Sequence, residues 1–309
     1  MNTSMKYISI AHTGFKASNI VMGCMRIHSL SLTAIDTLVK TAMDQGINFF
    51  DHADIYGKGT CETLFSQAIG MNSALREQMI IQSKCGIRNG FYDASKEYIL
   101  SAVDGILQRL QTDYLDILLL HRPDALVEPE EVAEAFDRLH SSGKVRSFGV
   151  SNYNPMQIEL LKKHIPYPII INQLQYSVAH TPLTDEGMAV NMLTDQAISR
   201  TGYVMDYCRL HDMTIQAWSP FQKGFFEGPF FLDPQYAALN EALTNYGKKY
   251  ELDLTGAAVA WITRHPANIQ VIVGTTQAKR LIACCKGSNL PMTREEWYGI
   301  YKAAGNSVP

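Results

Sequence analysis

The sequence predicts a (β/α)8 barrel, because eight short apolar segments alternate with helical patterns along its 309 residues. Parallel strands that helices cover on the outer face read as nearly continuous apolar runs rather than as alternating ones. Eight such strands can close into a ring, and a barrel of this kind occupies about 250 residues or more. No GxGxxG motif follows a strand, which argues against an open dinucleotide-binding sheet. We therefore expect one barrel domain spanning residues 1–309.

The elements follow one another in the order that a barrel requires. A short hairpin is expected within 6–23. The strand candidates are 19–23, 47–51, 79–84, 115–121, 145–152, 169–174, 214–219 and 269–274. Helical periodicity is clear between them, for example over 33–46, 93–110 and 129–144. Residues 292–305 predict an additional C-terminal helix, and the long connections 175–194 and 220–253 are expected to form lids or walls of a site.

Composition narrows the class of protein. Hydrophobic residues make up 46% of the chain and charged residues 18%, which is typical of a globular protein with a large core. A net charge of −3 argues against nucleic acid or an anionic membrane as the main partner. Six cysteines without a CxxC pair indicate reduced thiols and no zinc site. With no apolar run of membrane-spanning length and no clear signal peptide, the expected location is the cytoplasm.

Polar side chains follow the apolar strands at the end where a parallel barrel builds its active site. The strand ends carry Asp51, Lys84, His121, Arg122, Ser151, Asn152, Gln173, Trp218, Ser219, Gly274, Thr275 and Thr276. Tyr56 lies in the loop after Asp51, in the stretch "FFDHADIYG". A carboxylate, an amine and an imidazole on three neighbouring strands are therefore expected to converge near one phenol.

This combination suits proton transfer to an oxygen atom. A free tyrosine has a pKa of about 10, and a neighbouring ammonium lowers that value by favouring the phenolate. A carboxylate beside the ammonium keeps it charged and in place, and an imidazole can hydrogen-bond the same oxygen. The four residue types together predict a site that protonates a carbonyl oxygen while another group reduces the carbon.

Several motifs resemble those of the aldo-keto reductases. They are "D-x-A-x-x-Y-G" at 51–57, "SK" after the third strand, "LLLHRPD", "GVSN", "NQLQYS", "AWSPF" and "VIVGTTQAKRL". The resemblance runs from about residue 19 to 285 and looks closest to a bacterial subgroup of NADP-dependent oxidoreductases. It implies an enzyme that reduces aldehydes or ketones by hydride transfer from NADPH, on a small-molecule carbonyl substrate and without a metal.

The resemblance also implies roles for individual residues. Tyr56 would be the general acid, with Lys84 tuning it, Asp51 pairing with the lysine and His121 orienting the carbonyl. Ser151, Asn152 and Gln173 would bind the nicotinamide amide, and Trp218 would stack on the ring. The pyrophosphate would lie along Ser219, Phe221 and Lys223. The loop with Gly274, Thr275, Thr276 and the following Arg280 would hold the adenosine 2′-phosphate.

One position departs from the family pattern. Many members have a lysine where this chain has Gly274, in the stretch "VGTT". Arg280 is then the phosphate-binding charge, beside backbone and hydroxyl donors at a helix start. NADPH is still expected over NADH, because a guanidinium gains much more from a phosphate than from a ribose hydroxyl.

Other interpretations stay open at this point. A nucleotide-sensing protein with little turnover would keep the cleft without needing the four catalytic residues. A metal-dependent hydrolase would use His52, Asp54 and His121, but no three-ligand zinc spacing is present. Cys85, next to Lys84, could be an activated thiol. However, adjacent side chains on a strand point to opposite faces, so Cys85 should point away from the site.

The substrate pocket is expected to be open, because the loop after the fourth strand is short. Its candidate walls are Met25, Arg26, Phe91, Tyr92, Arg122, Tyr153, Tyr176, Phe225 and Phe226. Arg26 and Arg122 could favour acidic substrates, but salt bridges to nearby carboxylates are the expected role of both. Substrate identity and oligomeric state do not follow from these patterns.

Overall fold

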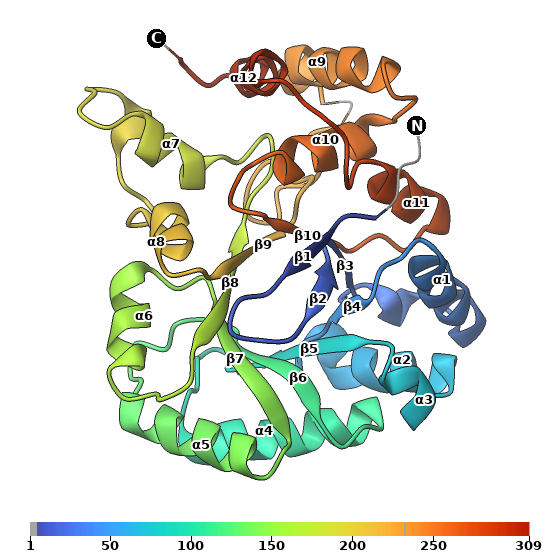
Figure 1. Ribbon diagram of the computed structural model, residues 1–309, viewed down its shortest axis with the longest axis vertical. Helices are drawn as coiled ribbons and strands as arrows, with labels where there is room; N and C mark the ends of the chain where they lie inside the picture. Colours follow the sequence, from blue (N-terminus) through green and yellow to red (C-terminus); the bar gives the residue numbers. More distant parts are fainter. Residues whose placement is uncertain (1–4, 232, 309) are drawn as a thin grey trace.

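A closed ring of eight parallel strands forms the centre of the computed structural model, which describes residues 5–231 and 233–308 (Figure 1). The strand order around the ring is β10-β3-β4-β5-β6-β7-β8-β9. The strands are β3 (Ile20–Gly23), β4 (Phe49–Asp51), β5 (Ile80–Cys85), β6 (Leu115–Leu120), β7 (Val145–Ser151), β8 (Ile169–Gln175), β9 (Thr214–Trp218) and β10 (Gln270–Val273). The predicted (β/α)8 barrel is confirmed, and each expected strand is present with its ends shifted by at most a few residues.

Helices surround this ring and cover the outer face of the strands (Figure 1). They are α1 (Leu32–Asp44), α2 (Thr60–Ile69), α3 (Ser73–Arg76), α4 (Lys96–Leu110), α5 (Pro129–Ser141), α6 (Pro155–Lys162), α7 (Pro182–Met188), α8 (Val204–Leu210), α9 (Ala237–Lys248), α10 (Leu254–Thr263), α11 (Ala278–Lys286) and α12 (Arg294–Ala303). Helix α5 shows why such segments are helical. Pro129 occupies its first turn with two glutamates, and Gly143 follows its end with φ of 76°.

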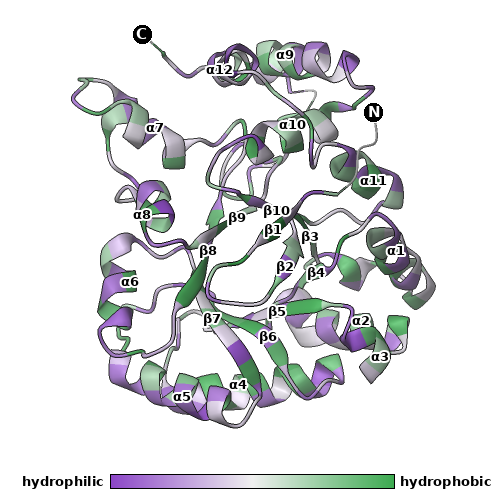
Figure 2. Ribbon diagram, in the orientation of Figure 1, coloured by the Kyte–Doolittle hydropathy of each residue, from purple (hydrophilic) through white to green (hydrophobic). Residues whose placement is uncertain are grey.

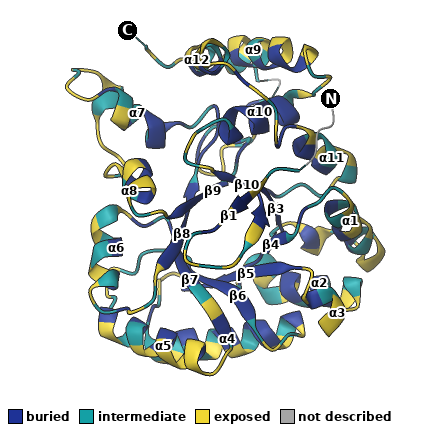
Figure 3. Cartoon of the chain, viewed as in Figure 1, coloured by how far each residue is buried: buried dark blue, intermediate teal, exposed yellow. Residues whose placement is uncertain are grey.

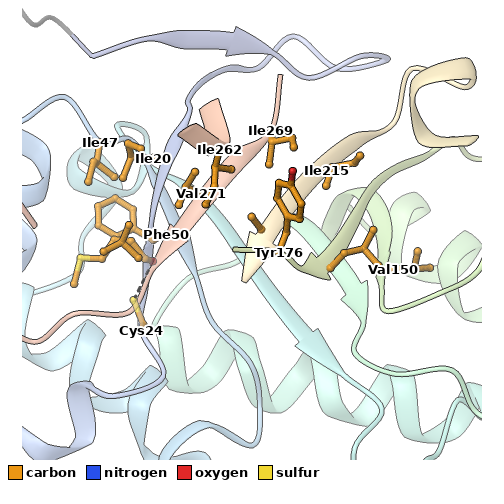
Figure 4. Packing of buried hydrophobic residues seen from close by; sticks show 14 of the residues in the cluster. Ile20, Cys24, Ile47, Phe50, Val150, Tyr176, Ile215, Ile262, Ile269 and Val271 are labelled. Carbon is orange, nitrogen blue, oxygen red and sulfur yellow. Dashed lines mark hydrogen bonds between the residues drawn. The ribbon is translucent and has the colours of Figure 1, made fainter. Parts of the chain in front are cut away.

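Hydropathy follows the same two layers. The strands are mostly hydrophobic and buried, whereas the outward faces of the surrounding helices are polar and exposed (Figures 2 and 3). Between strands and helices lies the main core, where Ile20, Val271 and Ile215 from the barrel and Ile262 from α10 are all fully or almost fully buried (Figure 4). Burial of this apolar layer is the main stabilising contribution to the fold.

The hairpin of β1 (Tyr7–Ser9) and β2 (Lys16–Ser18) closes the amino-terminal end of the barrel. Ile10 and Ala17 pack against inward-facing residues such as Phe49 and Ile117. Asn48, just before β4, accepts a hydrogen bond from the backbone N–H of Ser18 at 2.8 Å. The opposite, carboxyl-terminal end of the strands is therefore the end that remains for a site.

The two long connections contain helices of their own. Helix α7 and a 3-10 turn (Asp195–Ala197) follow β8, and a second 3-10 turn (Pro234–Tyr236) leads into α9 after β9. The predicted C-terminal helix is α12, which packs against α9, and the two lie side by side in Figure 1. Among the described residues, no helix is both long and apolar enough to cross a bilayer.

Candidate active site

The four predicted catalytic side chains meet at the carboxyl-terminal rim. The Lys84 ammonium lies 2.7 and 2.8 Å from the two carboxylate oxygens of Asp51 and 3.0 Å from the Tyr56 hydroxyl. The Tyr56 and His121 rings are 5.9 Å apart at an interplanar angle of 80°. Asp51 ends β4, Lys84 lies near the end of β5 and His121 follows β6, so three adjacent strands supply three of the groups.

Lys84 is fully buried and uses all of its donors within the protein. An ammonium has three N–H groups. They are directed to the Asp51 carboxylate, to the carbonyl oxygen of His52 at 2.7 Å and to the Tyr56 hydroxyl oxygen. Because the phenol oxygen accepts this hydrogen bond, its own proton remains available to another acceptor.

A tight turn holds Tyr56 in place. The backbone of the next three residues is left-handed, with φ of 58° at Gly57, 58° at Lys58 and 89° at Gly59. A Cβ atom at Gly57 would lie 2.8 Å from Thr60 Oγ1 and 2.9 Å from Cys61 Sγ. The space therefore requires a glycine at position 57, and its left-handed backbone is a conformation that glycine adopts without strain.

The shift in the pKa of Tyr56 is opposite in direction to the expected one. Burial raises the pKa of this phenol to about 12, although the Lys84 ammonium opposes the shift. The lysine itself keeps its charge. Burial is the largest single effect and lowers the pKa of Lys84, but the charges and hydrogen bonds of Asp51 and Tyr56 together outweigh it and raise that pKa. Tyr56 is consequently protonated throughout the neutral range.

His121 is neutral at physiological pH. Burial, followed by the positive charges of Lys84 and Arg122, lowers the pKa of its imidazole well below the usual range. Its buried Nδ1 atom has no hydrogen-bond partner among the described residues. A neutral imidazole carries one N–H donor, which is the form suited to bind a carbonyl oxygen.

The four residues expected to bind the nicotinamide form one hydrogen-bonded chain. The Trp218 indole N–H donates to Asn152 Oδ1 at 3.1 Å, and Asn152 Nδ2 donates to Ser151 Oγ at 2.8 Å. Ser151 Oγ donates in turn to the carbonyl oxygen of Gln173 at 3.0 Å. Asn152 and Ser219 have left-handed backbones, with φ of 62° and 51°, a strained conformation that concentrates at functional sites.

Gln173 belongs to a buried polar layer that sequence reasoning did not identify. Its Nε2 atom donates to Asp51 Oδ1 at 3.0 Å and to Gln216 Oε1 at 2.9 Å. Gln82 Nε2 makes the same two contacts, at 2.6 and 2.9 Å. Two amides from β5 and β8 therefore hold the carboxylate that holds Lys84.

The layer continues toward the hairpin. Gln216 Nε2 donates to Gln270 Oε1 at 3.0 Å, and Gln270 Nε2 donates to the carbonyl oxygen of Ser18 at 2.8 Å. These glutamines face the barrel interior and are fully buried. The available signal was a glutamine inside each apolar strand, as in "IIQSK" and "TIQAW".

The remaining predicted cofactor residues lie on two loops of the same rim. Phe221 packs against Phe231 with ring centroids 5.4 Å apart, and Lys223 pairs with Asp233 at 2.7 Å. After β10, the residues 274–277 lead into α11, and Thr275 Oγ1 accepts the backbone N–H of Gln277 at 3.2 Å. Arg280 lies exposed in the first turn of that helix, and no described carboxylate lies within 4.0 Å of it.

The mouth of the site differs in part from the expected walls. Phe91, Tyr92, Phe225 and Phe226 are exposed, as expected for rim aromatics. Tyr153 and Tyr176 were also expected as walls of the substrate pocket, but they are 2% and 0% exposed, so that expectation is wrong. Tyr176 lies in the core (Figure 4), where its hydroxyl is 2.8 Å from Thr184 Oγ1.

The expected salt bridges of the two rim arginines are absent from the part of the chain that the structure describes. Neither Arg26 nor Arg122 has a carboxylate within 4.0 Å there. The Arg122 guanidinium carbon instead lies 5.5 Å from the Phe225 ring centroid and 5.9 Å from that of Trp218. A guanidinium without a carboxylate partner therefore lies at the mouth.

His52, Asp54 and Cys85 do not belong to the tetrad of Asp51, Tyr56, Lys84 and His121. His52 is fully buried against Phe65, with ring centroids 4.6 Å apart, and burial lowers its pKa to about 3. Asp54 accepts a hydrogen bond from the Tyr98 hydroxyl at 2.7 Å. Burial raises the pKa of the Cys85 thiol well above its usual value, so it is not an activated thiol. Within residues 5–231 and 233–308, no group of three or more His, Cys, Asp or Glu side chains could hold a metal ion.

Comparison with known proteins identifies the class. The Aldo/keto reductase family model matches residues 19–304. This chain belongs to the aldo/keto reductase family. It is an oxidoreductase of a family that typically uses NADPH or NADH.

Bacterial relatives match almost the whole chain. The oxidoreductase YdhF of Escherichia coli is 35% identical, over 98% of this chain and 99% of its own length. The uncharacterized oxidoreductase YcsN of Bacillus subtilis is 33% identical, over 94% and 96%. A 6-dehydroglucose reductase of Novosphingobium aromaticivorans is also 33% identical, over 97% and 96%. The predicted likeness to a bacterial subgroup of the family is confirmed.

The fold is also that of solved family structures. A thermostable aldo-keto reductase, solved with the inhibitor epalrestat, superimposes with a TM-score of 0.78 at 22% identity and covers 97% of this chain and 100% of its own. At this level of identity, the likeness concerns the fold alone.

Proposed function

We propose that this protein is an NADP(H)-dependent reductase of aldehydes or ketones, with Tyr56 as its general acid. The carbonyl carbon receives a hydride and the carbonyl oxygen receives the Tyr56 proton, so that the C=O π bond is replaced by one C–H and one O–H bond. NADPH supplies the hydride when bound. The single observation that carries the proposal is the saturation of Lys84, which leaves the phenol proton of Tyr56 free for the substrate.

The pKa values support this division of roles. A phenol with a pKa of about 12 stays protonated at neutral pH. It is nevertheless a much stronger acid than an alcohol, whose pKa lies near that of water, about 15.7. Proton transfer from Tyr56 to a developing alkoxide is therefore favourable. The neutral His121 donates a hydrogen bond to the same oxygen and orients the carbonyl.

The rim residues fit a nicotinamide amide in their donor and acceptor types. Both amide hydrogens of Gln173 are directed to Asp51 and Gln216, so its Oε1 is the polar atom left to accept from a carboxamide NH2 group. Asn152 uses one amide hydrogen on Ser151 and keeps a second to donate to a carboxamide oxygen. Trp218 offers an aromatic face beside them.

The loop after β10 suits the phosphate end of NADPH. Arg280 has no carboxylate partner in the described chain, and it stands in the first turn of α11, where backbone N–H groups favour an anion. Ser219, Phe221 and Lys223 are proposed to follow the pyrophosphate, with Gly274, Thr275 and Thr276 near the 2′-phosphate. Lys223 would share its charge between Asp233 and the cofactor.

The test is the oxidation of NADPH by purified protein with a reactive aromatic aldehyde. Replacing Tyr56 by Phe should lower kcat by about 10²–10⁴-fold, the usual contribution of a general acid. Tyr98→Phe is the matched control, because it removes another partly buried hydroxyl, bonded to Asp54, outside the tetrad. Equal activity of wild type and Tyr56→Phe would disprove the acid assignment. Tight NADPH binding without turnover over a broad carbonyl panel would instead favour a nucleotide-sensing role.

A further inference from the structure

We propose that Arg122 is an anion-binding residue of the substrate pocket, and that the preferred substrates are carbonyl compounds that carry a carboxylate. The inference rests on the proposed function, because it names the substrate class of the same site. The Arg122 guanidinium is partly buried without a polar partner among the described residues, unlike those of the other buried arginines.

The other partly or fully buried arginines have partners. Arg76 lies 2.7 Å from Asp116, Arg109 lies 2.7 Å from Glu62, and Arg264 Nε donates to the carbonyl oxygen of Met292 at 2.6 Å. Arg122 is partly buried, but its guanidinium has no carboxylate within 4.0 Å and no hydrogen-bond acceptor among the described residues. Withdrawing a charge from water is unfavourable unless a partner compensates for it, so an unpaired guanidinium in a cleft indicates an anion that arrives from outside.

The position of Arg122 assigns that anion to the substrate rather than to the cofactor phosphates. Arg122 directly follows His121 at the end of β6, and its positive charge contributes to the low pKa of that imidazole. In the strand ring, β6 and β10 stand on opposite sides of the barrel, four steps apart in either direction. The loop proposed to hold the 2′-phosphate follows β10. The guanidinium is thus next to the carbonyl-binding residue and across the barrel from Arg280.

The surroundings of Arg122 also describe the body of the ligand. Its guanidinium lies over the rings of Phe225 and Trp218. Burial lowers the pKa of Arg122, and the nearby Tyr92 opposes that shift. Phe225 and Tyr92 are 58% and 45% exposed, so they offer apolar surface at the mouth. Aromatic faces bind flat or apolar groups, while the planar guanidinium matches the two oxygens of a carboxylate. A monoanion also balances the single positive charge.

The experiment compares matched acidic and neutral aldehydes with NADPH. We expect 4-carboxybenzaldehyde or its 3-isomer to exceed the corresponding methyl ester in kcat/KM by roughly ten- to a hundredfold, the range of a charge-assisted hydrogen bond. Arg122→Met should lower this ratio to about one, and Arg122→Lys should keep part of it. Arg88→Met is the matched control, because this rim arginine is already paired with Asp93 at 3.2 Å, and its loss should leave the ratio unchanged.

A second readout does not depend on turnover of the acidic substrate. Benzoate should inhibit reduction of the neutral ester by the wild type and not by Arg122→Met, and both proteins should melt at similar temperatures. Equal kcat/KM for acid and ester in the wild type, or an equal loss for both in Arg122→Met, would overturn the inference and leave the proposed function standing. Stronger preference for 4-formylphenyl phosphate than for the carboxylate would overturn the choice of anion. No NADPH oxidation with any aldehyde, the esters included, would defeat the proposed function itself.

Discussion

Replacing Asp51 by Asn should destabilise the protein strongly and reverse the effect of alkaline pH on its stability. Asp51 is 1% exposed and provides the counter-charge of the fully buried Lys84. An asparagine retains one acceptor for the amides of Gln82 and Gln173, but it then directs its own NH2 group at the Lys84 ammonium. Flipping the amide only moves the conflict between donors to the glutamines.

The magnitude follows from the loss of one partner of a buried ion pair, which costs about 3–5 kcal/mol. For a chain of this size, each kcal/mol corresponds to about 2 °C in the melting temperature, so a decrease of about 6–10 °C is expected. The matched control is Asp36→Asn. It removes the carboxylate of the Asp36–Lys40 pair, also 2.7 Å long, but the lysine there is 71% exposed. Such an exposed pair contributes about 0.2–1 kcal/mol, so the control should melt within about 2 °C of the wild type.

The sign of the pH dependence is the sharper criterion. In the wild type, the pKa of Lys84 is raised above its ordinary 10.5, so its contribution is complete at lower pH and is lost only as the pH rises through that folded-state value. Without Asp51, burial, the largest single effect on this lysine, is opposed only by Tyr56, and we expect it to lower the folded-state pKa below 10.5. The variant should then gain stability as the pH rises toward 10.5, where the wild type does not. Thermal melts monitored by circular dichroism from pH 7 to 10 measure both slopes. A melting temperature within 1 °C of the wild type, or parallel pH profiles, would refute the role of Asp51 as the counter-charge.

Two further predictions concern the reaction. Oxidation of an alcohol with NADP+ needs the phenolate of Tyr56, whose pKa is about 12, so kcat/KM for the alcohol should rise with pH from 7 to 9. The kcat/KM for carbonyl reduction should stay nearly constant over the same range, because Tyr56 remains protonated and His121 remains neutral. Initial rates in both directions measure this, and an oxidation rate independent of pH would contradict the assignment. Arg280→Met should raise KM for NADPH by about ten- to a hundredfold, the scale of a lost charge-assisted contact, with little change for NADH. Equal effects on both cofactors would show that Arg280 does not recognise the 2′-phosphate.

The position of the tetrad could be predicted from the sequence because barrel topology is regular. Parallel strands direct all their carboxyl ends to one rim, so the residues after "INFF", "IIQS" and "LDILLL" are neighbours before any distance is known. The alternation of side chains along a strand likewise separates Lys84, which faces inward, from Cys85, which packs in the outer core. The spacing of residues is sufficient for both conclusions.

Energetic properties of the same residues did not follow from spacing. The expected fall in the pKa of Tyr56 considered the nearby ammonium but not burial, which acts in the opposite direction and is larger. The salt bridge of Arg122 was expected because carboxylates lie near this arginine in the sequence. In the fold, Asp93 pairs with Arg88, while Asp124 accepts backbone N–H groups of Ala94 and Leu126. Desolvation and competition between partners depend on the three-dimensional arrangement.

The glutamine layer shows how the chemistry at the rim determines residues deeper in the barrel. Asp51 Oδ1 accepts from Lys84, Gln82 and Gln173. A buried carboxylate needs such donors because it has lost its hydrogen bonds to water. Each glutamine introduces polar atoms that must also be satisfied, and one acceptor, Gln216 Oε1, serves both amides. Gln216 then needs an acceptor of its own, which the next glutamine provides, and that chain ends at a backbone carbonyl of the hairpin. Within its own strand, each of these glutamines is an isolated polar residue in an apolar run. Their presence is explained by the donors that the Asp51 carboxylate needs and by the acceptors that each glutamine needs in turn, on four different strands.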